Sequence, residues 1–306
     1  MPNEFRAPEG WEGYVNSVIE KTSLLISLGI WEGIDELNLN RWLQNFQTDR
    51  EKYLGACMLD AFTYRSPKMC HSMMRNILMD LVPNYCKRNS IIDIQSIQHW
   101  RNLVDSGVQA VRFVPVNIND GKIKSSAVVA REFIHANDIP QHFIQQPSVL
   151  GRAIDNGTKL VVFIDDFAGS GFQFLKFLRQ NPIDNYQDKA KFLYAPLCAH
   201  QDAIDRIEKE TGQVRVIPID TLTDQHNFFY SCEEGFFRGD KTNSPENARS
   251  FYEELFTQCS NKKYLFGMNN QSLTYSFFFS TPNNNIKALY HNELNVWKRL
   301  IFRGKS

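Results

Sequence analysis

The stretch KLVVFIDDFAGSGFQF, from Lys159 to Phe174, decides the fold of this chain. Residues 160–164 form an unbroken apolar run rich in β-branched side chains, which is typical of a strand buried on both faces of a parallel sheet. Asp165 and Asp166 follow where that strand is expected to end, and a loop of small residues, 168–171, comes next. Apolar residues then recur at helical spacing. The stretch therefore predicts a strand, an acidic pair, a glycine-rich turn and a helix.

This arrangement suits a phosphosugar. Gly169 and Gly171 allow positive φ and a close approach of the backbone to an anion, and Ser170 adds a hydroxyl donor. Asp165 and Asp166 can accept hydrogen bonds from vicinal sugar hydroxyls or help to hold Mg²⁺. The loop lacks the Gly-Lys-Ser/Thr ending of a nucleoside-triphosphate loop and the three spaced glycines of a dinucleotide site. An acidic turn that merely ends a buried strand is the alternative interpretation.

Composition excludes several classes of protein. The 306 residues carry 34 Lys and Arg against 34 Asp and Glu, so the formal net charge is zero and no basic excess indicates nucleic-acid binding. No apolar run reaches membrane-spanning length, and the first residues lack a signal pattern. The six cysteines form no CxxC pair, which favours free thiols. We therefore expect a cytoplasmic protein that is not bound to a membrane.

The rest of the chain supports an α/β core that follows a helical region. Residues 11–104 carry apolar side chains at helical spacing, and Thr48 with Glu51 predicts a capping box. Strands and helices then alternate, which implies right-handed crossovers and a three-layer parallel sheet. The further strands are expected at 108–116, 138–144, 191–198 and 214–219.

A second polar loop precedes the helix expected at 127–135. Lys122, Lys124, Ser125 and Ser126 lie in this loop, and cations beside the start of a helix attract anions. A solvated lysine loop with a serine cap is the alternative.

The opening stretch resembles the ribose-5-phosphate-binding motif of type I phosphoribosyltransferases. Asp165 and Asp166 match its acidic pair, Gly169 its small residue, Ser170 its Thr and Gly171 its first Gly, whereas Phe172 and Gln173 replace the usual Gly-Thr. The resemblance implies that Asp165 and Asp166 are catalytic and metal-binding, with Mg²⁺ as the cofactor. It also implies that residues 169–173 hold the 5′-phosphate and that Lys122, Lys124, Ser125 and Ser126 face the diphosphate of phosphoribosyl diphosphate.

The C-terminal region is similar to that of a phosphoribosyltransferase-like family of bacterial conflict systems. The matching residues are Phe277, Phe278, Phe279, Thr281, Pro282, Asn283, Asn284, Trp297, Leu300, Phe302 and Arg303. The segment WLQNFQTDRE at 42–51 also looks like that family's helical entry, so the resemblance covers roughly 40–303. It implies a neighbouring partner such as a retron reverse transcriptase or another anti-phage protein. Asn283 and Asn284 become candidates for the acceptor side, or else they simply build a turn.

These observations predict a three-layer parallel-sheet phosphoribosyltransferase-like core at 107–220, within a domain spanning 105–306. A helical region, 1–104, precedes this core, and an irregular α+β extension, 221–306, follows it. The leading hypothesis is a defence-system effector that binds phosphoribosyl diphosphate or a nucleotide and acts at the sugar C1. A non-catalytic nucleotide sensor and a scaffold subunit are the rivals. A phosphatase or receiver domain is disfavoured because those folds lack a following Gly-Ser-Gly loop.

Overall fold

The computed structural model describes residues 4–116, 125–231, 233–261 and 263–303, and it contains two compact units. The flanking unit joins Met1–Pro67 to Thr223–Ser306, and the sheet unit is the segment Lys68–Leu222 between them. The sequence placed a boundary after residue 104. The chain divides elsewhere because the helices after Pro67 pack with a helix of the sheet unit: the Arg75 side chain donates a hydrogen bond to the carbonyl of Ala136.

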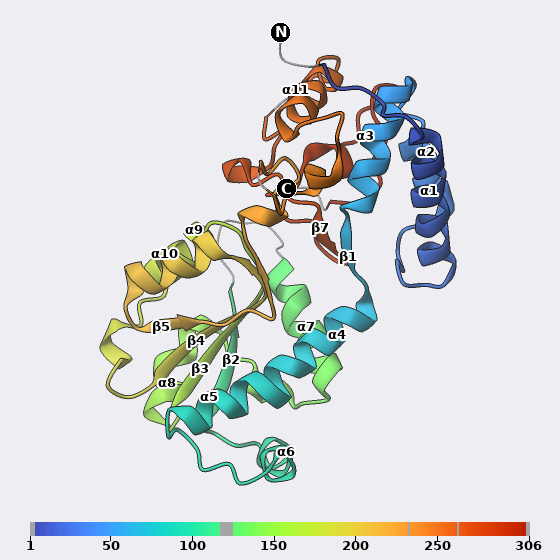
Figure 1. The fold of residues 1–306 in the computed structure, drawn as a ribbon. Coiled ribbons are helices and arrows are strands. Elements are labelled where there is room, and N and C mark those ends of the chain that lie inside the picture. Colours follow the sequence, from blue (N-terminus) through green and yellow to red (C-terminus); the bar gives the residue numbers. More distant parts are fainter. Residues whose placement is uncertain (1–3, 117–124, 232, 262, 304–306) are drawn as a thin grey trace. The chain divides into compact units, whose positions relative to one another are not determined.

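The sheet unit has a parallel sheet in the order β2-β3-β4-β5, with β6 also paired to β4 (Figure 1). This confirms the predicted α/β class. The strands are β2 (Val111–Pro115), β3 (Leu160–Ala168), β4 (Lys191–His200), β5 (Val214–Val216) and β6 (Asp220–Leu222). The helices are α4 (Pro67–Asn76), π-helix η1 (Ile77–Leu81), α5 (Val82–Arg88), α6 (Ile97–Asp105), α7 (Ser125–Asn137), α8 (Leu150–Asp155), α9 (Phe172–Gln180) and α10 (Gln201–Thr211). Short 3₁₀ turns are η2 (Gln141–Phe143), η3 (Pro147–Val149) and η4 (Asp184–Tyr186).

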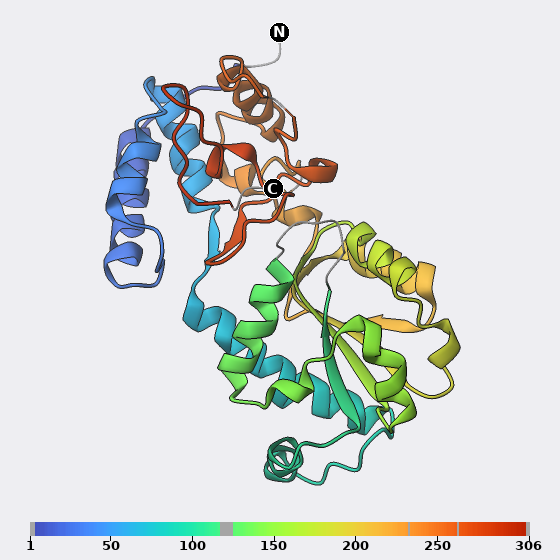
Figure 2. The ribbon, with the colours of Figure 1, turned by 180° about the vertical axis from the view of Figure 1, so that it is seen from behind.

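Helices cover both faces of this sheet (Figures 1 and 2). Alternate residues of each strand point to opposite sides, so each face presents apolar side chains for a helix to cover. On one face, the ring of Phe163 in β3 packs against Phe174 and Phe177 of α9 at centroid distances of 5.3 and 5.7 Å. On the other face, Phe113 of β2 packs against Phe133 of α7 at 4.7 Å. A sheet buried on both sides explains the unbroken apolar run of β3.

Two expected strands differ in the structure, and a proline accounts for each difference. Residues 138–144 form the 3₁₀ turn η2 and one bridge, Ile144 with Phe113, because Pro140 has no N–H to donate to a strand ladder. The strand expected at 214–219 ends at Val216 as β5, and Pro218 separates it from β6, which begins at Asp220 beyond the expected range. The sheet is therefore shorter at both edges than the apolar pattern indicates.

The flanking unit is helical and aromatic-rich, and its chain ends meet in one core. Its helices are α1 (Trp11–Ser27), α2 (Glu36–Leu43), α3 (Asp49–Asp60) and α11 (Pro245–Leu255), with β1 (Thr63–Arg65) parallel to β7 (Tyr275–Phe277). Its 3₁₀ turns are η5 (Asp224–His226), η6 (Phe236–Gly239), η7 (Met268–Asn270) and η8 (Lys287–Leu289). The indole N–H groups of Trp42 and Trp297, both fully buried, donate to the same carbonyl, that of Ala288. The capping box of Thr48 and Glu51 is present at the start of α3, as predicted.

No helix in the described part of the chain is long and apolar enough to cross a membrane.

Candidate functional site

The acidic pair lies where β3 loses one of its two neighbours. β2 pairs with β3 only as far as Pro115 opposite Ile164, whereas β4 continues alongside β3 to Ala168. Asp165 and Asp166 therefore lie inside the last part of β3, whereas the sequence pattern placed them after its end. They lie at the carboxyl end of the sheet, where open α/β sheets bind their ligands.

The two carboxyl groups of the pair interact with each other as well as with the fold. A side-chain hydrogen bond joins Asp165 and Asp166, and the charge of Asp166 acts on Asp165. Asp165 also meets Tyr194 of the neighbouring strand β4. The sequence treated the pair as one ligand set, and its assignment to catalysis and metal binding remains a prediction.

Asp165 is a buried structural carboxyl with 1% exposure. Its Oδ1 accepts a hydrogen bond from the Asp166 amide at 3.0 Å, and its Oδ2 accepts one from the Tyr194 hydroxyl at 3.1 Å. Burial, followed by the charge of Asp166, raises the pKa of Asp165 well above its ordinary value, and burial also raises the pKa of Tyr194. The Tyr194 ring in turn stacks on Phe174 of α9 at 4.0 Å and 8°. Asp165 therefore fixes the strand end to the first turn of α9.

Asp166 is the less buried carboxylate of the pair. It is 7% exposed, and its Oδ1 accepts a hydrogen bond from the Phe167 amide at 2.9 Å. It lies beyond the point where β2 stops pairing with β3. Mg²⁺ commonly takes one or two carboxylates and completes its octahedron with water and substrate phosphate oxygens. A carboxylate pair of this kind belongs to that donor set, although both oxygens of Asp165 also accept hydrogen bonds inside the protein.

The loop after β3 leads into an α9 N-terminus with no side-chain cap. Gly171 is the N-cap residue with φ of 79°, and no side chain in the described part of the chain accepts its first amides. The start of a helix with free N–H groups attracts phosphate through those groups and the helix dipole. A β-carbon at Gly171 would lie 3.1 Å from Ile207 and 3.2 Å from the Ala203 carbonyl of α10, which is tighter than an ordinary contact, so α10 would have to shift to accept a larger residue there.

Arg206 of α10 supplies a cation beside this loop that the sequence did not indicate. Its guanidinium donates to the Ser170 carbonyl at 2.6 Å and lies 4.1 Å above the ring of Phe172. Phe172 is 55% exposed, so the stack lies at the surface of the α9 N-terminus. An arginine that is held in this way can offer its remaining N–H groups to a phosphate. Gln173 is exposed on the same turn.

The predicted diphosphate residues come after β2 in the sequence. Lys122 and Lys124 lie outside the described residues. Ser125 and Ser126 form the first turn of α7, and their side chains are likewise not described. Their role as diphosphate ligands remains a prediction.

Asn283 and Asn284 belong to the flanking unit, and their assignment to an acceptor remains a prediction. The Asn284 amide is buried and donates to Gln271 at 2.7 Å and to the Met268 carbonyl at 3.2 Å. Asn283 is exposed and accepts a hydrogen bond from Arg303. Within this unit the asparagine run clearly builds a turn, whatever else it does.

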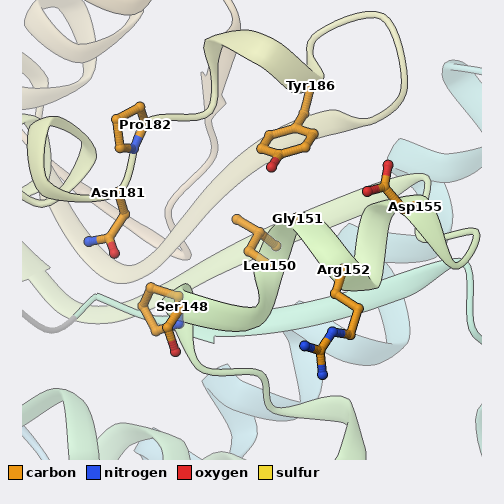
Figure 3. A pocket seen from close by; sticks show the side chains of 9 residues that line it. Ser148, Leu150, Gly151, Arg152, Asp155, Asn181, Pro182 and Tyr186 are labelled. Carbon is orange, nitrogen blue, oxygen red and sulfur yellow. The ribbon is translucent and has the colours of Figure 1, made fainter.

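Figure 3 shows the residues that line a hollow of about 520 Å³ in the sheet unit. Its lining includes Ser148, Leu150, Asn181 and Tyr186. The first two precede β3 in the chain, and the last two precede β4. The hollow is thus associated with the amino ends of these strands, whereas Asp166 lies near the carboxyl end of β3. It carries none of the predicted site residues.

One comparison with known proteins identifies the family. A family model described as PRTase-CE matches residues 39–303, so the chain belongs to this phosphoribosyltransferase-like family. Neither curated proteins nor solved structures gave a match. The match covers both units and agrees with the parallel α/β core.

We expect Tyr194→Phe to destabilise the protein by about 1–3 kcal/mol, because it leaves a buried oxygen of Asp165 without its donor. Urea unfolding measures the change. Tyr186→Phe is the matched control, since the Tyr186 hydroxyl has no hydrogen bond within the described residues. Equal stability of the two variants would contradict a structural role for the Tyr194–Asp165 bond.

We expect Gly171→Ala to destabilise the protein more than Gly212→Ala. Both residues have left-handed φ, 79° and 65°, which costs alanine about 1–2 kcal/mol. Only Gly171 also lacks room for a β-carbon, whereas Gly212 faces open space. Urea unfolding of both variants isolates the packing contribution, and an equal loss at the two positions would show that α10 adjusts freely.

Proposed function

We propose that the sheet unit binds the ribose-5-phosphate part of phosphoribosyl diphosphate or of a nucleotide, at the carboxyl ends of β2 and β3. The observation that carries the proposal is the combination of the uncapped α9 N-terminus with the carboxylate of Asp166 at the end of the adjoining strand. The PRTase-CE family assignment supports the same ligand class.

Each group has a distinct task in this proposal. The α9 amides and the Arg206 guanidinium hold the 5′-phosphate, and Asp166 accepts hydrogen bonds from the ribose hydroxyls. Asp165 does not touch the ligand but keeps Asp166 and α9 in position through Tyr194. When bound, Mg²⁺ would neutralise the diphosphate charge, with Asp166 as a protein ligand.

The reaction that fits this site is substitution at the sugar C1. The bond from C1 to the diphosphate oxygen breaks, the diphosphate leaves with the electron pair, and an acceptor forms the new bond to C1. The transition state has oxocarbenium character, so the protein contributes chiefly by positioning and charge stabilisation. A base, water or a macromolecule could be the acceptor that this chemistry uses.

A non-catalytic nucleotide sensor is the second candidate function. It is favoured by Phe172 and Gln173, which replace the usual Gly-Thr at the phosphate loop, and by the stack of the exposed Phe172 ring with Arg206. A place in an anti-phage defence system, with a reverse transcriptase or another defence protein as partner, is proposed on the C-terminal sequence resemblance.

Calorimetric titration with phosphoribosyl diphosphate and Mg²⁺ tests the proposal. We expect binding by the wild-type protein and at least a tenfold weaker affinity for Asp166→Asn, because a charge-assisted bond is worth about 1.5–3 kcal/mol. Asp188→Asn, which removes an exposed carboxylate elsewhere in the same unit, should bind normally. No binding by the folded wild-type protein would exclude this ligand.

Arg206→Gln should weaken the same binding by roughly tenfold, because it removes a cation from the phosphate loop. Arg215→Gln serves as its control, since Arg215 forms an exposed ion pair with Glu208 and lies away from the loop. If Arg206→Gln binds like wild type while Asp166→Asn does not, the phosphate is held by the backbone alone. Turnover that Asp166→Asn removes marks an enzyme, whereas ligand-dependent association with a partner marks a sensor.

A further inference from the structure

A hollow lined by cations lies in the flanking unit, in a part of the molecule that the proposed phosphosugar site does not use. A hollow of about 400 Å³ is lined by Arg41, Lys298, Arg299, Asn38 and Asn292. Three of these side chains are cations, two are amides, and none is a carboxylate. Such a lining offers hydrogen-bond donors and positive charge together.

The three cations are not neutralised by the protein. None of Arg41, Lys298 and Arg299 forms an ion pair with a residue in the described ranges. The nearby Glu293 is engaged instead with His291 at 3.1 Å and with the Ser260 amide. Because the whole chain has as many acidic as basic residues, three unpaired cations around one hollow are a local concentration of charge.

The amide and arginine donors in the hollow are also unused. The side chains of Asn38 and Asn292 make no hydrogen bond within the part of the chain that the structure covers. Arg299 stacks on the Phe302 ring at 4.6 Å, and its N–H groups have no hydrogen-bond acceptor among the residues that the structure describes. Arg41 lies in the last turn of α2, where a cation also complements the helix dipole, but Lys298 and Arg299 have no such explanation.

The walls of the hollow are held rigidly. The Asn45 side chain donates to the Lys298 carbonyl at 2.7 Å and accepts from the Lys298 amide at 2.8 Å. Trp42, which follows Arg41 in the chain, and Trp297, which precedes Lys298, both donate a hydrogen bond to the Ala288 carbonyl. The helix that carries Arg41 and the segment that carries Lys298 and Arg299 are therefore fixed to each other before any ligand arrives, which lowers the entropy cost of binding.

We propose that this hollow binds an oligophosphate group, with Arg41, Lys298 and Arg299 as its ligands. Guanidinium groups match phosphate oxygens in bidentate fashion, and an ammonium adds a further point charge. A multiply charged phosphate chain is the class of anion that uses three convergent cations. Inorganic tripolyphosphate and a nucleoside triphosphate are the two sources of this chemistry.

Calorimetric titration of the full chain with tripolyphosphate is the test. Wild-type protein should bind, and Arg41→Gln and Arg299→Gln should each weaken binding about tenfold. Arg41→Lys and Arg299→Lys, which retain the charge, should lose less. Lys52→Gln, which removes an exposed cation elsewhere in the unit, should bind like wild type. Binding should also weaken as salt is raised, because the site is electrostatic.

Two further titrations show which unit binds the anion and whether a nucleoside adds to the affinity. Arg206→Gln should leave tripolyphosphate binding unchanged, and loss of binding in that variant would overturn the proposal because the anion would then occupy the phosphate loop of the sheet unit. If ATP binds as tightly as tripolyphosphate, the hollow recognises the phosphate chain alone. If ATP binds more tightly through Arg41 and Arg299, the nucleoside also contributes to binding. Both results support the proposal.

Three outcomes overturn it. They are no binding by the folded wild-type protein, equal binding by wild type and both glutamine variants, and binding of a single-stranded oligonucleotide through Arg41 and Arg299 without binding of tripolyphosphate. Because the glutamine variants change side chains at a surface hollow, unfolding midpoints close to wild type should accompany the loss of affinity.

Discussion

The hydrogen bond between the Tyr194 hydroxyl and the buried carboxyl of Asp165 is the constraint on which the candidate site depends. It is formed where no water can replace either partner, so its loss would leave a costly unpaired group. Through Asp165 it sets the backbone at Asp166, and through the stack of Tyr194 on Phe174 it sets the first turn of α9. One buried interaction thus places both the carboxylate and the helix end that a phosphosugar would meet.

The two aspartates form a coupled pair at the end of β3. Their side chains are hydrogen-bonded to each other and both are buried, so the charge of Asp166 acts on Asp165 at close range. In the proposed function, Asp166 meets the ligand while Asp165 supports it. An uncapped helix terminus and Arg206 then complete the polar surroundings of the loop.

Much of this was predictable from local sequence pattern. The buried strand, the glycine turn and the following helix were correct, because apolar spacing and the left-handed requirement at Gly171 are local properties. The contributions of Tyr194 and Arg206 were not predictable, since they reach Asp165 and Ser170 from residues 29 and 36 positions away. The sequence predicted too many strand residues near the edges of the sheet, because Pro140 and Pro218 interrupt apolar segments that otherwise have the pattern of strands.

The two-segment construction of the flanking unit has a consequence for synthesis of the protein. β1 pairs with β7 across more than 200 residues, Thr63 with Tyr275, whereas the sheet unit is one continuous segment. During translation the sheet unit is complete first, while the N-terminal helices wait for the partners of their aromatic core. Such long-range closure is slow and leaves apolar surface uncovered in the meantime, so a nascent chain halted before residue 223 is the form most exposed to aggregation and to chaperones.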